Sequence, residues 1–485
     1  MIQFFSTYDN VFYTIAAICF ILGLKKLSHP KTARKGNFIA ILGMFIAIVV
    51  AIFVGTTNAA PDNIELSFII TGIMIGAAIG TIIALKIQMT SIPQMVAAFN
   101  GFGGAASALI ATAEFYKFKS EHFGTDCGVD CINETIFITI MFSVIIGTLT
   151  FTGSFVAFGK LQGLISGQPI QFKGQKFFTA LLALSLFTVI ANSFLYSYPN
   201  LNYSLVNNSF LIIIIISALL GILLTIAIGG ADMPVVISLL NSYSGIAAAA
   251  TGFVINNQAL IICGSLVGAS GMILTQIMCK GMNRSLANVI FGGVGGEVEG
   301  QKDKQKEMNI KSYTTSDIAL IFDSADKIII VPGYGLAVAQ AQHAIREISD
   351  YLQNKGKTVL YAIHPVAGRM PGHMNVLLAE SNVSYDILKD LDQVNSEFET
   401  ADIALIIGAN DVVNPAARHD KSSPIYGMPI LDVDKSKTVI INKRSMNPGF
   451  AGIMNELFGY DNSIMVFGDA KDMLTNLLSD LKELE

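Results

Sequence analysis

Tryptophan is absent from this sequence, and charged residues are scarce. The 485 residues include no Trp, and Asp, Glu, Lys and Arg together make up 14% of the chain. Because soluble domains carry roughly 25% charged residues, this composition excludes a chain built only from ordinary soluble domains. Hydrophobic residues reach 52% and there are 43 glycines. Much of the chain is therefore expected to lie in lipid.

Histidine and cysteine are also few, and their positions exclude several kinds of site. None of the six His falls in a long apolar run, so a histidine relay inside the membrane is not expected. The last 185 residues contain no Cys, and no nucleophile with a paired base is recognisable there. Cys127 and Cys131 share one polar loop, which leaves a disulfide open. We predict no metal site, and no signal peptide, since no Lys or Arg precedes the first apolar run.

The charges are unevenly distributed along the chain. The first 300 residues hold 13 Lys and Arg and 11 Asp and Glu, whereas the last 185 hold 18 and 25. The second part has a net charge of −7, which gives no support to nucleic-acid binding. We therefore predict a membrane domain over 1–282, a linker over 283–312 and a soluble domain over 313–485.

The first part contains nine apolar stretches of spanning length. Most are close to the twenty or so residues that cross a bilayer as a helix, and the first is shorter. Glycines four residues apart, as in Gly76/Gly80 and Gly264/Gly268, are typical of closely packed helices. We predict a polytopic all-α bundle in the bilayer with spans at approximately 11–24, 37–57, 66–87, 92–113, 135–158, 177–196, 209–229, 233–255 and 258–279.

Basic residues between the spans predict the orientation. With nine spans, one set of loops holds eleven Lys and Arg, and the other holds only Lys117 and Lys119. The rule that basic loops stay in the cytoplasm then places the N-terminus outside and the C-terminal domain in the cytoplasm. The basic set is Lys25, Lys26, Lys31, Arg34, Lys35, Lys86, Lys160, Lys173, Lys176, Lys280 and Arg284.

A few polar residues inside or beside the spans are candidates for function, because burying them in lipid is costly. Asn100 lies in the fourth span and Asn241 in the eighth. Either could line a conducting path, or could bond across helices and serve packing alone. Asp232 precedes the eighth span, and we expect it near the cytoplasmic face.

The second part begins with a pattern typical of nucleotide binding. The apolar stretch 327–331 predicts a buried strand, and the glycine-rich turn Gly333–Val338 follows it and opens a helix through Ile348. Glycines in such a turn let backbone amides approach a pyrophosphate at the helix N-terminus. Alternation with helical stretches predicts a Rossmann-like, doubly wound parallel sheet, with further strands at 358–362, 402–407, 428–432, 438–441 and 464–467.

The residues after the strands favour one nucleotide over the other. An NAD site usually has an acidic residue about 20 residues past the glycines, and the strand over 358–362 ends without one. Lys443, Arg444 and Ser445 follow the strand that ends at Ile441. Two cations and a hydroxyl suit a 2′-phosphate, although adjacent cations also occur in solvated loops. The pattern therefore favours NADP(H).

Several long motifs resemble one family. They are PQMVAAFNGFGGAA (93–106), GGADMPVVISLLNSYSG (229–245), HPVAGRMPGHMNVLLAE (364–380), GANDVVNPAA (408–417), SPIYGMPIL (423–431), KRSM (443–446) and FGDAK (467–471). Together they cover most of the chain in one order. The sequence resembles the beta subunit of proton-translocating nicotinamide nucleotide transhydrogenases.

That resemblance carries expectations about activity and partners. A Re/Si-specific transhydrogenase would transfer hydride between NAD(H) and NADP(H), coupled to proton movement into the cytoplasm. NADP(H) would bind this chain, and NAD(H) would bind a partner alpha subunit, within a dimer of alpha–beta pairs. The family also implies a bacterial inner membrane, with the N-terminus in the periplasm.

The resemblance further implies roles for single residues. The turn Gly333, Tyr334, Gly335, Leu336, Ala337 and Val338 would lie near the pyrophosphate. Arg369 and Asp411 would hold or sense NADP(H), and Lys443, Arg444 and Ser445 would contact the 2′-phosphate. Asp232 and Asn241 match positions implicated in coupling. We expect no catalytic side chain, because the cofactors carry hydride chemistry.

This sequence departs from the family at two positions. Many members have His where this chain has Asn100, and Asn cannot exchange a proton. A titrating group is then expected on the partner or on an acid not identified in this chain. Phe450 stands where Tyr is common, so it would keep a lid-like ring without the hydroxyl. Rival readings are a channel gated by a nucleotide-binding domain and a membrane NADPH dehydrogenase, which no flavin, haem or iron–sulfur motif supports.

Overall fold

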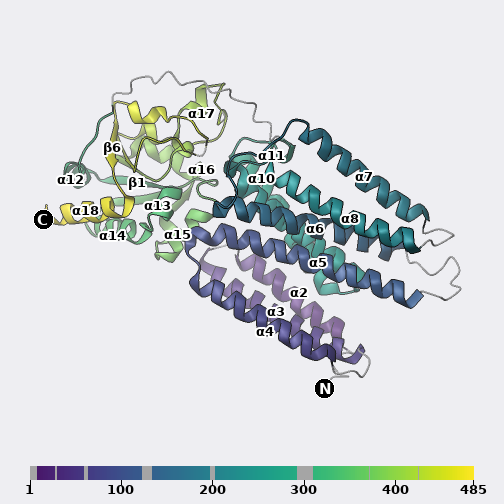
Figure 1. The fold of residues 1–485 in the computed structure, drawn as a ribbon. Helices are drawn as coiled ribbons and strands as arrows, with labels where there is room; N and C mark the ends of the chain where they lie inside the picture. The colour runs from purple at the N-terminus through teal and green to yellow at the C-terminus, as the bar shows by residue number, and fades with distance from the viewer. Residues whose placement is uncertain are drawn as a thin grey trace. The chain divides into compact units, whose positions relative to one another are not determined.

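The computed structural model describes the chain over residues 8–27, 30–58, 64–122, 134–196, 203–291, 310–370, 372–423, 425–449 and 451–484. Two compact units can be separated within it (Figure 1). The bundle unit comprises Met1–Ile165, Gln171–Ile226 and Leu239–Met272, and the sheet unit comprises Ser166–Ile170, Ala227–Ser238 and Ile273–Glu485. Most of the predicted linker and both loop cysteines lie outside the described residues.

Nine helices among the described residues are long and apolar enough to cross a membrane. Their positions confirm the nine predicted spans, and the protein is a multi-pass membrane protein. The short helices η3 (Gly230–Asp232) and α11 (Leu286–Phe291) flank the last two spans. The nine are α2 (Asp9–Leu27), α3 (Pro30–Asn58), α4 (Ile64–Lys86), α5 (Ile92–His122), α6 (Glu134–Gln162), α7 (Gln175–Tyr196), α8 (Tyr203–Ile226), α9 (Met233–Val254) and α10 (Gln258–Gly281).

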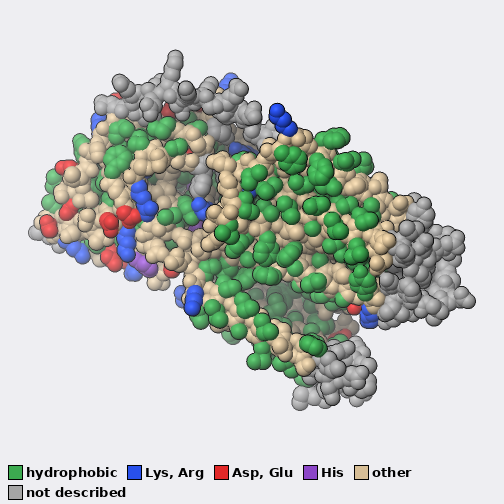
Figure 2. Space-filling view, in the orientation of Figure 1, with side chains coloured by type: hydrophobic (Ala, Val, Ile, Leu, Met, Phe, Trp, Pro, Cys, Tyr) green, Lys and Arg blue, Asp and Glu red, His purple; other side chains and the backbone are tan. Residues whose placement is uncertain are grey.

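Large apolar side chains cover the outward faces of these helices. Figure 2 shows hydrophobic side chains spread over the bundle, and examples such as Phe68 and Phe177 are 72% and 75% exposed. No described side chain of α4 is buried. Apolar surface of this extent is expected of helices that lie in hydrocarbon.

Glycines bring helices of the bundle close together, but not at every predicted position. A Cβ on Gly264 of α10 would lie 2.7 Å from the backbone oxygen of Gly245 on α9, and one on Gly245 would lie 2.5 Å from the backbone nitrogen of Gly268. The prediction for Gly264 and Gly268 is therefore confirmed. The prediction for Gly76 and Gly80 is wrong for the described residues, because a Cβ at either would meet nothing within 4 Å.

Two polar side chains donate hydrogen bonds to backbone oxygens in the last turn of α8. The last carbonyls of a helix have no partner within the helix itself. Lys160 of α6 is buried and donates its Nζ–H to the backbone oxygen of Ile226 at 2.6 Å. Gln175 of α7 donates its Nε2–H to the backbone oxygen of Leu223 at 3.0 Å. These bonds tie three helices together at one end of the bundle.

The sheet unit contains six parallel strands with the order β3-β2-β1-β4-β5-β6. This is the strand order of a doubly wound dinucleotide-binding fold, and it confirms the predicted fold class. The strands are β1 (Lys327–Pro332), β2 (Thr358–Ile363), β3 (Leu388–Asp390), β4 (Ile403–Ile407), β5 (Thr438–Lys443) and β6 (Ser463–Phe467). The longer helices are α12 (Thr315–Ser324), α14 (Gln342–Asn354), α15 (His373–Glu380) and α18 (Ala470–Glu483).

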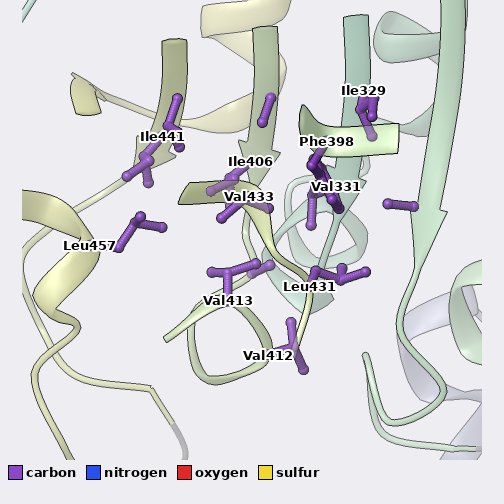
Figure 3. Packing of buried hydrophobic residues seen from close by; sticks show 14 of the residues in the cluster. Ile329, Val331, Phe398, Ile406, Val412, Val413, Leu431, Val433, Ile441 and Leu457 are labelled. Carbon is purple, nitrogen blue, oxygen red and sulfur yellow. The ribbon is translucent and has the colours of Figure 1, made fainter. Parts of the chain in front are cut away.

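The core of this unit lies on both faces of the central strands. Ile329 and Ile406 belong to a cluster on one face that also includes Phe398 and Leu431 (Figure 3). The alternate residues Ile328, Ile330 and Leu405 are also fully buried. Burial of both faces is what the uninterrupted apolar runs predict for a parallel sheet.

One predicted strand of the sheet does not form, and one strand that does form was not predicted. No strand forms over 428–432, because Pro429 has no backbone N–H and the neighbouring backbone groups bond to partners outside the sheet. For example, Asn395 donates to the backbone oxygen of Ile430 at 3.0 Å. The short edge strand β3 was not predicted.

The helix after the glycine-rich turn is also interrupted. The sequence predicted one helix through Ile348, but α13 (Tyr334–Val338) ends before α14 begins at Gln342. Gln340 adopts a left-handed conformation, with φ of 51°, between them. Ala and Gln both favour helices, so the residue types gave no indication of this break.

Candidate functional site

The segments that follow β1 and β4 approach each other at three glycines, here called the glycine crossing, where the strand order reverses. The residues after β1 and β4 approach so closely that a Cβ on Gly408 would lie 2.5 Å from the backbone nitrogen of Leu336. A Cβ on Gly333 or Gly335 would likewise meet the backbone of Gly408 or Ala409. Ligands of doubly wound sheets bind at this reversal, beyond the carboxyl ends of the strands.

A pocket of about 260 Å³ opens beside this crossing. It is built from the segments that follow β1, β4, β5 and β6, and two cations, Lys443 and Arg444, are in its wall. The lining residues are Gly335, Val338, Gly408, Ala409, Asn410, Asn442, Lys443, Arg444, Ser445, Asn447, Pro448, Gly449 and Ala470.

The two cations are held by different contacts. Lys443 is half-buried, donates its Nζ–H to the backbone oxygen of Asn447 at 2.7 Å, and lies 4.8 Å from the ring centre of Phe458. Burial lowers the pKa of Lys443, and the Asp411 carboxylate opposes that shift. Arg444 is more exposed, and its Nη2 donates to Asp469 Oδ2 at 2.6 Å. The pocket therefore has a fixed cation and a cation on its rim.

Asp411 lies next to the segment that follows the cations. Its Oδ2 accepts the backbone N–H of Ala451 at 3.0 Å. A Cβ on Gly449 would lie 2.5 Å from Asp411 Oδ1, so only glycine fits there. Asp411 thus holds the chain at Ala451, although it does not itself line the pocket.

Arg369 and Tyr334 form a separate stacked pair. The Arg369 guanidinium lies 4.4 Å from the centre of the Tyr334 ring, and the centres of the Tyr334 and His373 rings lie 5.9 Å apart at an interplanar angle of 67°. The backbone N–H of Arg369 donates to Nδ1 of His373 at 3.0 Å, and Gly368, which directly precedes Arg369, has φ of 109°. Neither Arg369 nor Tyr334 lines the pocket.

Five of the predicted cofactor residues line one pocket, namely Gly335, Val338, Lys443, Arg444 and Ser445. Gly333, Leu336 and Ala337 do not line it, and Leu336 and Ala337 are buried residues of α13. Phe450 lies outside the described residues. Sequence reasoning missed Asn410 and Gly449 among others, although the Gly-Ala-Asn run directly after the buried strand β4 was a usable indication.

His364, at the end of β2, is held as a neutral ring. Its Nε2 bonds to the backbone oxygen of Pro429 at 2.7 Å, and its Nδ1 accepts the N–H of Val366 at 3.2 Å. Burial lowers its pKa to about 4 from 6.5. The unfolded chain therefore binds a proton first as pH falls, so this residue's stabilisation is complete above pH 6.5 and is lost toward pH 4.

We expect the sheet unit to lose about 3 kcal/mol of stability through His364 between these two pH values. Amide hydrogen exchange of the full chain at pH 7 and pH 4 would measure the loss across β2. A His364→Gln variant should show a smaller change with pH, and the exposed His343→Gln should behave as the parent. An equal pH response in all three proteins would contradict the assignment.

The polar candidates of the membrane part lie in different surroundings. Asn100 is buried in α5, and Asn241 is half-buried in α9. Asp232, in η3, pairs with Arg284 through a contact of 2.9 Å between Oδ2 and Nη1. Burial raises the pKa of Asp232, and Arg284 opposes this.

A buried hydroxyl cluster in the bundle was not predicted. Ser143 of α6 and Thr251 of α9 lie 2.8 Å apart between their hydroxyl oxygens. Both hydroxyls also lie 3.5 Å from the backbone oxygen of Ser107 on α5. The sequence did not indicate the cluster, because single hydroxyl residues are common in apolar helices and only the packing brings these together.

Comparison with known proteins identifies the family. The NAD(P) transhydrogenase beta subunit family matches residues 9–480. The chain belongs to this family. Two relatives from Rhodospirillum rubrum, each named NAD(P) transhydrogenase subunit beta, are 50% identical over 468 residues, which cover 96% of this chain and 97% of each relative.

Membership of the NAD(P) transhydrogenase beta subunit family confirms the resemblance found in the sequence. The word subunit in the name implies a partner chain. The likeness extends over both the nine apolar helices and the six-stranded sheet. The transhydrogenase family also supports an oxidoreductase role.

Proposed function

We propose that this chain binds NADP(H) in the pocket beside the glycine crossing and acts as the beta subunit of a proton-translocating, Re/Si-specific transhydrogenase. The observation that carries the proposal is the convergence of the Gly335 turn with Lys443, Arg444 and Ser445 on one pocket. The glycines of the turn let a pyrophosphate approach the backbone closely, and the two cations suit a 2′-phosphate. The residues present therefore fit the cofactor.

Roles for the other site residues follow from their contacts. Asp411 would sense the nucleotide through the segment over 447–451, whose amide it binds, and Phe450 would contribute a ring to that segment. Arg369, stacked on Tyr334, would hold the ligand on the other side of the turn. When bound, NADP(H) supplies or accepts the hydride, so no catalytic side chain is required.

The proposal includes a partner and a direction. An alpha subunit would hold NAD(H), two alpha–beta pairs would form the complex, and protons would move into the cytoplasm across a bacterial inner membrane. The loop charges support a periplasmic N-terminus and a cytoplasmic sheet unit. Asn100, Asp232 and Asn241 would belong to the path or to its coupling. Linkage requires that NADP(H) occupancy and proton affinity change each other equally.

The nucleotide assignment is tested by calorimetric titration of the full chain with NADPH and with NADH. We expect clear preference for NADPH, and about 100-fold weaker NADPH binding in a Lys443→Ala/Arg444→Ala variant. Two hydrogen bonds to charged groups at about 1.5 kcal/mol each account for that factor. NADH binding should change little, because NADH has no 2′-phosphate.

A Lys421→Ala/Lys482→Ala variant is the matched control, because it removes the same charge from two exposed positions away from the pocket. It should bind NADPH as the parent does. Equal affinity of the parent for the two nucleotides, or equal losses in the two variants, would overturn the proposal.

A further inference from the structure

Positive charge collects at the start of α7, in a part of the sequence that has no acidic residue. Between Glu134 and Asp232 the chain contains no Asp or Glu, and its only charged residues there are Lys160, Lys173 and Lys176. Lys160 is buried and bound to the end of α8. Lys173 and Lys176 are both exposed, on either side of the first residue of α7. Two cations are therefore accessible at one end of an apolar span.

The helix itself adds to this charge. The amino end of a helix carries a partial positive charge, so acidic residues are favourable in the first turn and lysines are not. The first turn of α7 contains no acidic residue. An anion from outside the chain would therefore balance the charge of Lys173, of Lys176 and of the helix end together.

The turn that carries Lys173 is fixed to the neighbouring helix. Gln175 is buried, and its Oε1 accepts the backbone N–H of Phe172 at 3.3 Å while its Nε2 donates to the backbone oxygen of Leu223 at 3.0 Å. Gly174 completes the turn in a left-handed conformation, with φ of 86°. A ligand of the two lysines thus meets a backbone that is already ordered, which lowers the entropic cost of binding.

An exposed apolar face continues from the lysines along α7. Phe177, Leu181 and Leu184 follow one another at intervals of four and three residues, so they lie on one side of the helix. Each is at least 50% exposed. Little of α7 is buried within the chain, and the helix packs against α8 (Figure 1). Because α7 has the length of a membrane span, this face can lie along an acyl chain, and the lysines lie at the level of the lipid headgroups.

We propose that Lys173 and Lys176, together with the Phe177 face of α7, bind an anionic phospholipid. Its phosphate would pair with the two lysines, and an acyl chain would cover the exposed side of the helix. A zwitterionic lipid carries its own cation beside the phosphate and gains less from the lysines. A phosphate ion in solution would pair with the lysines but would gain nothing from the apolar face.

The absence of Trp from the chain allows a direct test. Phe177→Trp places a single fluorophore on the proposed surface, and Trp is a common residue at the membrane boundary. The full chain is reconstituted in vesicles that contain brominated phosphatidylglycerol or brominated phosphatidylcholine, each of which quenches Trp on contact. We expect phosphatidylglycerol to be preferred about tenfold or more, because each lysine near a charged lipid surface contributes a factor of about five.

Two charge variants of this reporter distinguish the site from the overall charge of the protein. Lys173→Gln/Lys176→Gln should remove the preference. Lys25→Gln/Lys26→Gln removes the same charge from the last turn of α2, where the negative end of the helix already balances the lysines, and should leave the preference unchanged. Equal quenching by the two lipids in the parent reporter, or equal losses of preference in the two variants, would overturn the inference.

Two further outcomes concern the source of the ligand. Inorganic phosphate, added at constant ionic strength, should leave the preference for phosphatidylglycerol unchanged. Loss of the preference in phosphate would show a site for a free anion instead of a lipid. Quenching of the Phe177→Trp reporter by neither lipid would show that a second copy of the chain covers this face. Either of these two results would also overturn the inference.

Discussion

Replacing Gly408 by alanine is expected to disrupt the glycine crossing, where the segments after β1 and β4 approach each other, and to abolish nucleotide binding. Gly408 has φ of 66°, and an added Cβ would lie 2.6 Å from the backbone carbon of Gly335. The left-handed conformation costs a non-glycine residue about 1–2 kcal/mol, and overpacking adds about 1–3 kcal/mol. The backbone of Gly335 cannot move away without carrying α13 and the pocket wall with it.

Amide hydrogen exchange of the full chain would measure this effect, with the loss of protection expected across β1 and β4. Gly356→Ala is the matched control, because Gly356 has φ of 80° but nothing within 4 Å of an added Cβ. It should lose only the conformational part, about 1–2 kcal/mol, and should keep NADPH binding. Equal losses of stability in the two variants would show that the backbone contact at Gly408 contributes nothing to stability.

Replacing Gly264 by leucine is expected to separate α9 from α10 and to prevent normal assembly of the bundle. An added Cβ would already lie 2.7 Å from the backbone oxygen of Gly245 and 2.9 Å from the Cα of Ala249. Close approach of backbones is a main source of helix association in lipid, where no hydrophobic force drives helices together. The loss is expected to be about 3 kcal/mol or more, since overpacking alone costs up to about 3 kcal/mol.

Far-UV circular dichroism of the detergent-solubilised chain, titrated with sodium dodecyl sulfate, would report this loss of stability. The variant should unfold at a lower concentration of sodium dodecyl sulfate than the parent. Gly76→Leu on α4 makes the same chemical change in open space, and its transition should stay at the parent position. A common transition for Gly264→Leu and Gly76→Leu would argue against the contact between α9 and α10.

The fold could be predicted well because its main determinants are local. Apolar length fixed the number of spans, and the strand over 327–331 followed by glycines indicated the first strand and turn of the sheet. Local sequence patterns gave wrong predictions for segments whose backbone hydrogen bonds go to residues distant in the sequence. Leu431 sits in a buried apolar run, yet its N–H donates to the backbone oxygen of Val412, outside the strand ladder.

The site was predictable in its chemistry but not in its arrangement. Lys443 and Arg444 follow a strand, so their place beyond its carboxyl end could be inferred. The orientation of Asn410 could not, because it depends on Asn455, which is 45 residues away. Glycine spacing likewise did not distinguish Gly264, which contacts another helix, from Gly76, which does not.

The bonds from Lys160 and Gln175 to the end of α8 also bear on how the bundle assembles. Until α6, α7 and α8 are in place, those carbonyls can be satisfied only by water at the membrane surface. Docking of α6 then removes water from the Ile226 carbonyl, and docking of α7 removes it from the Leu223 carbonyl. Mechanical extraction of α7 should therefore return only the Leu223 carbonyl to water, while Lys160 still holds α8 to α6.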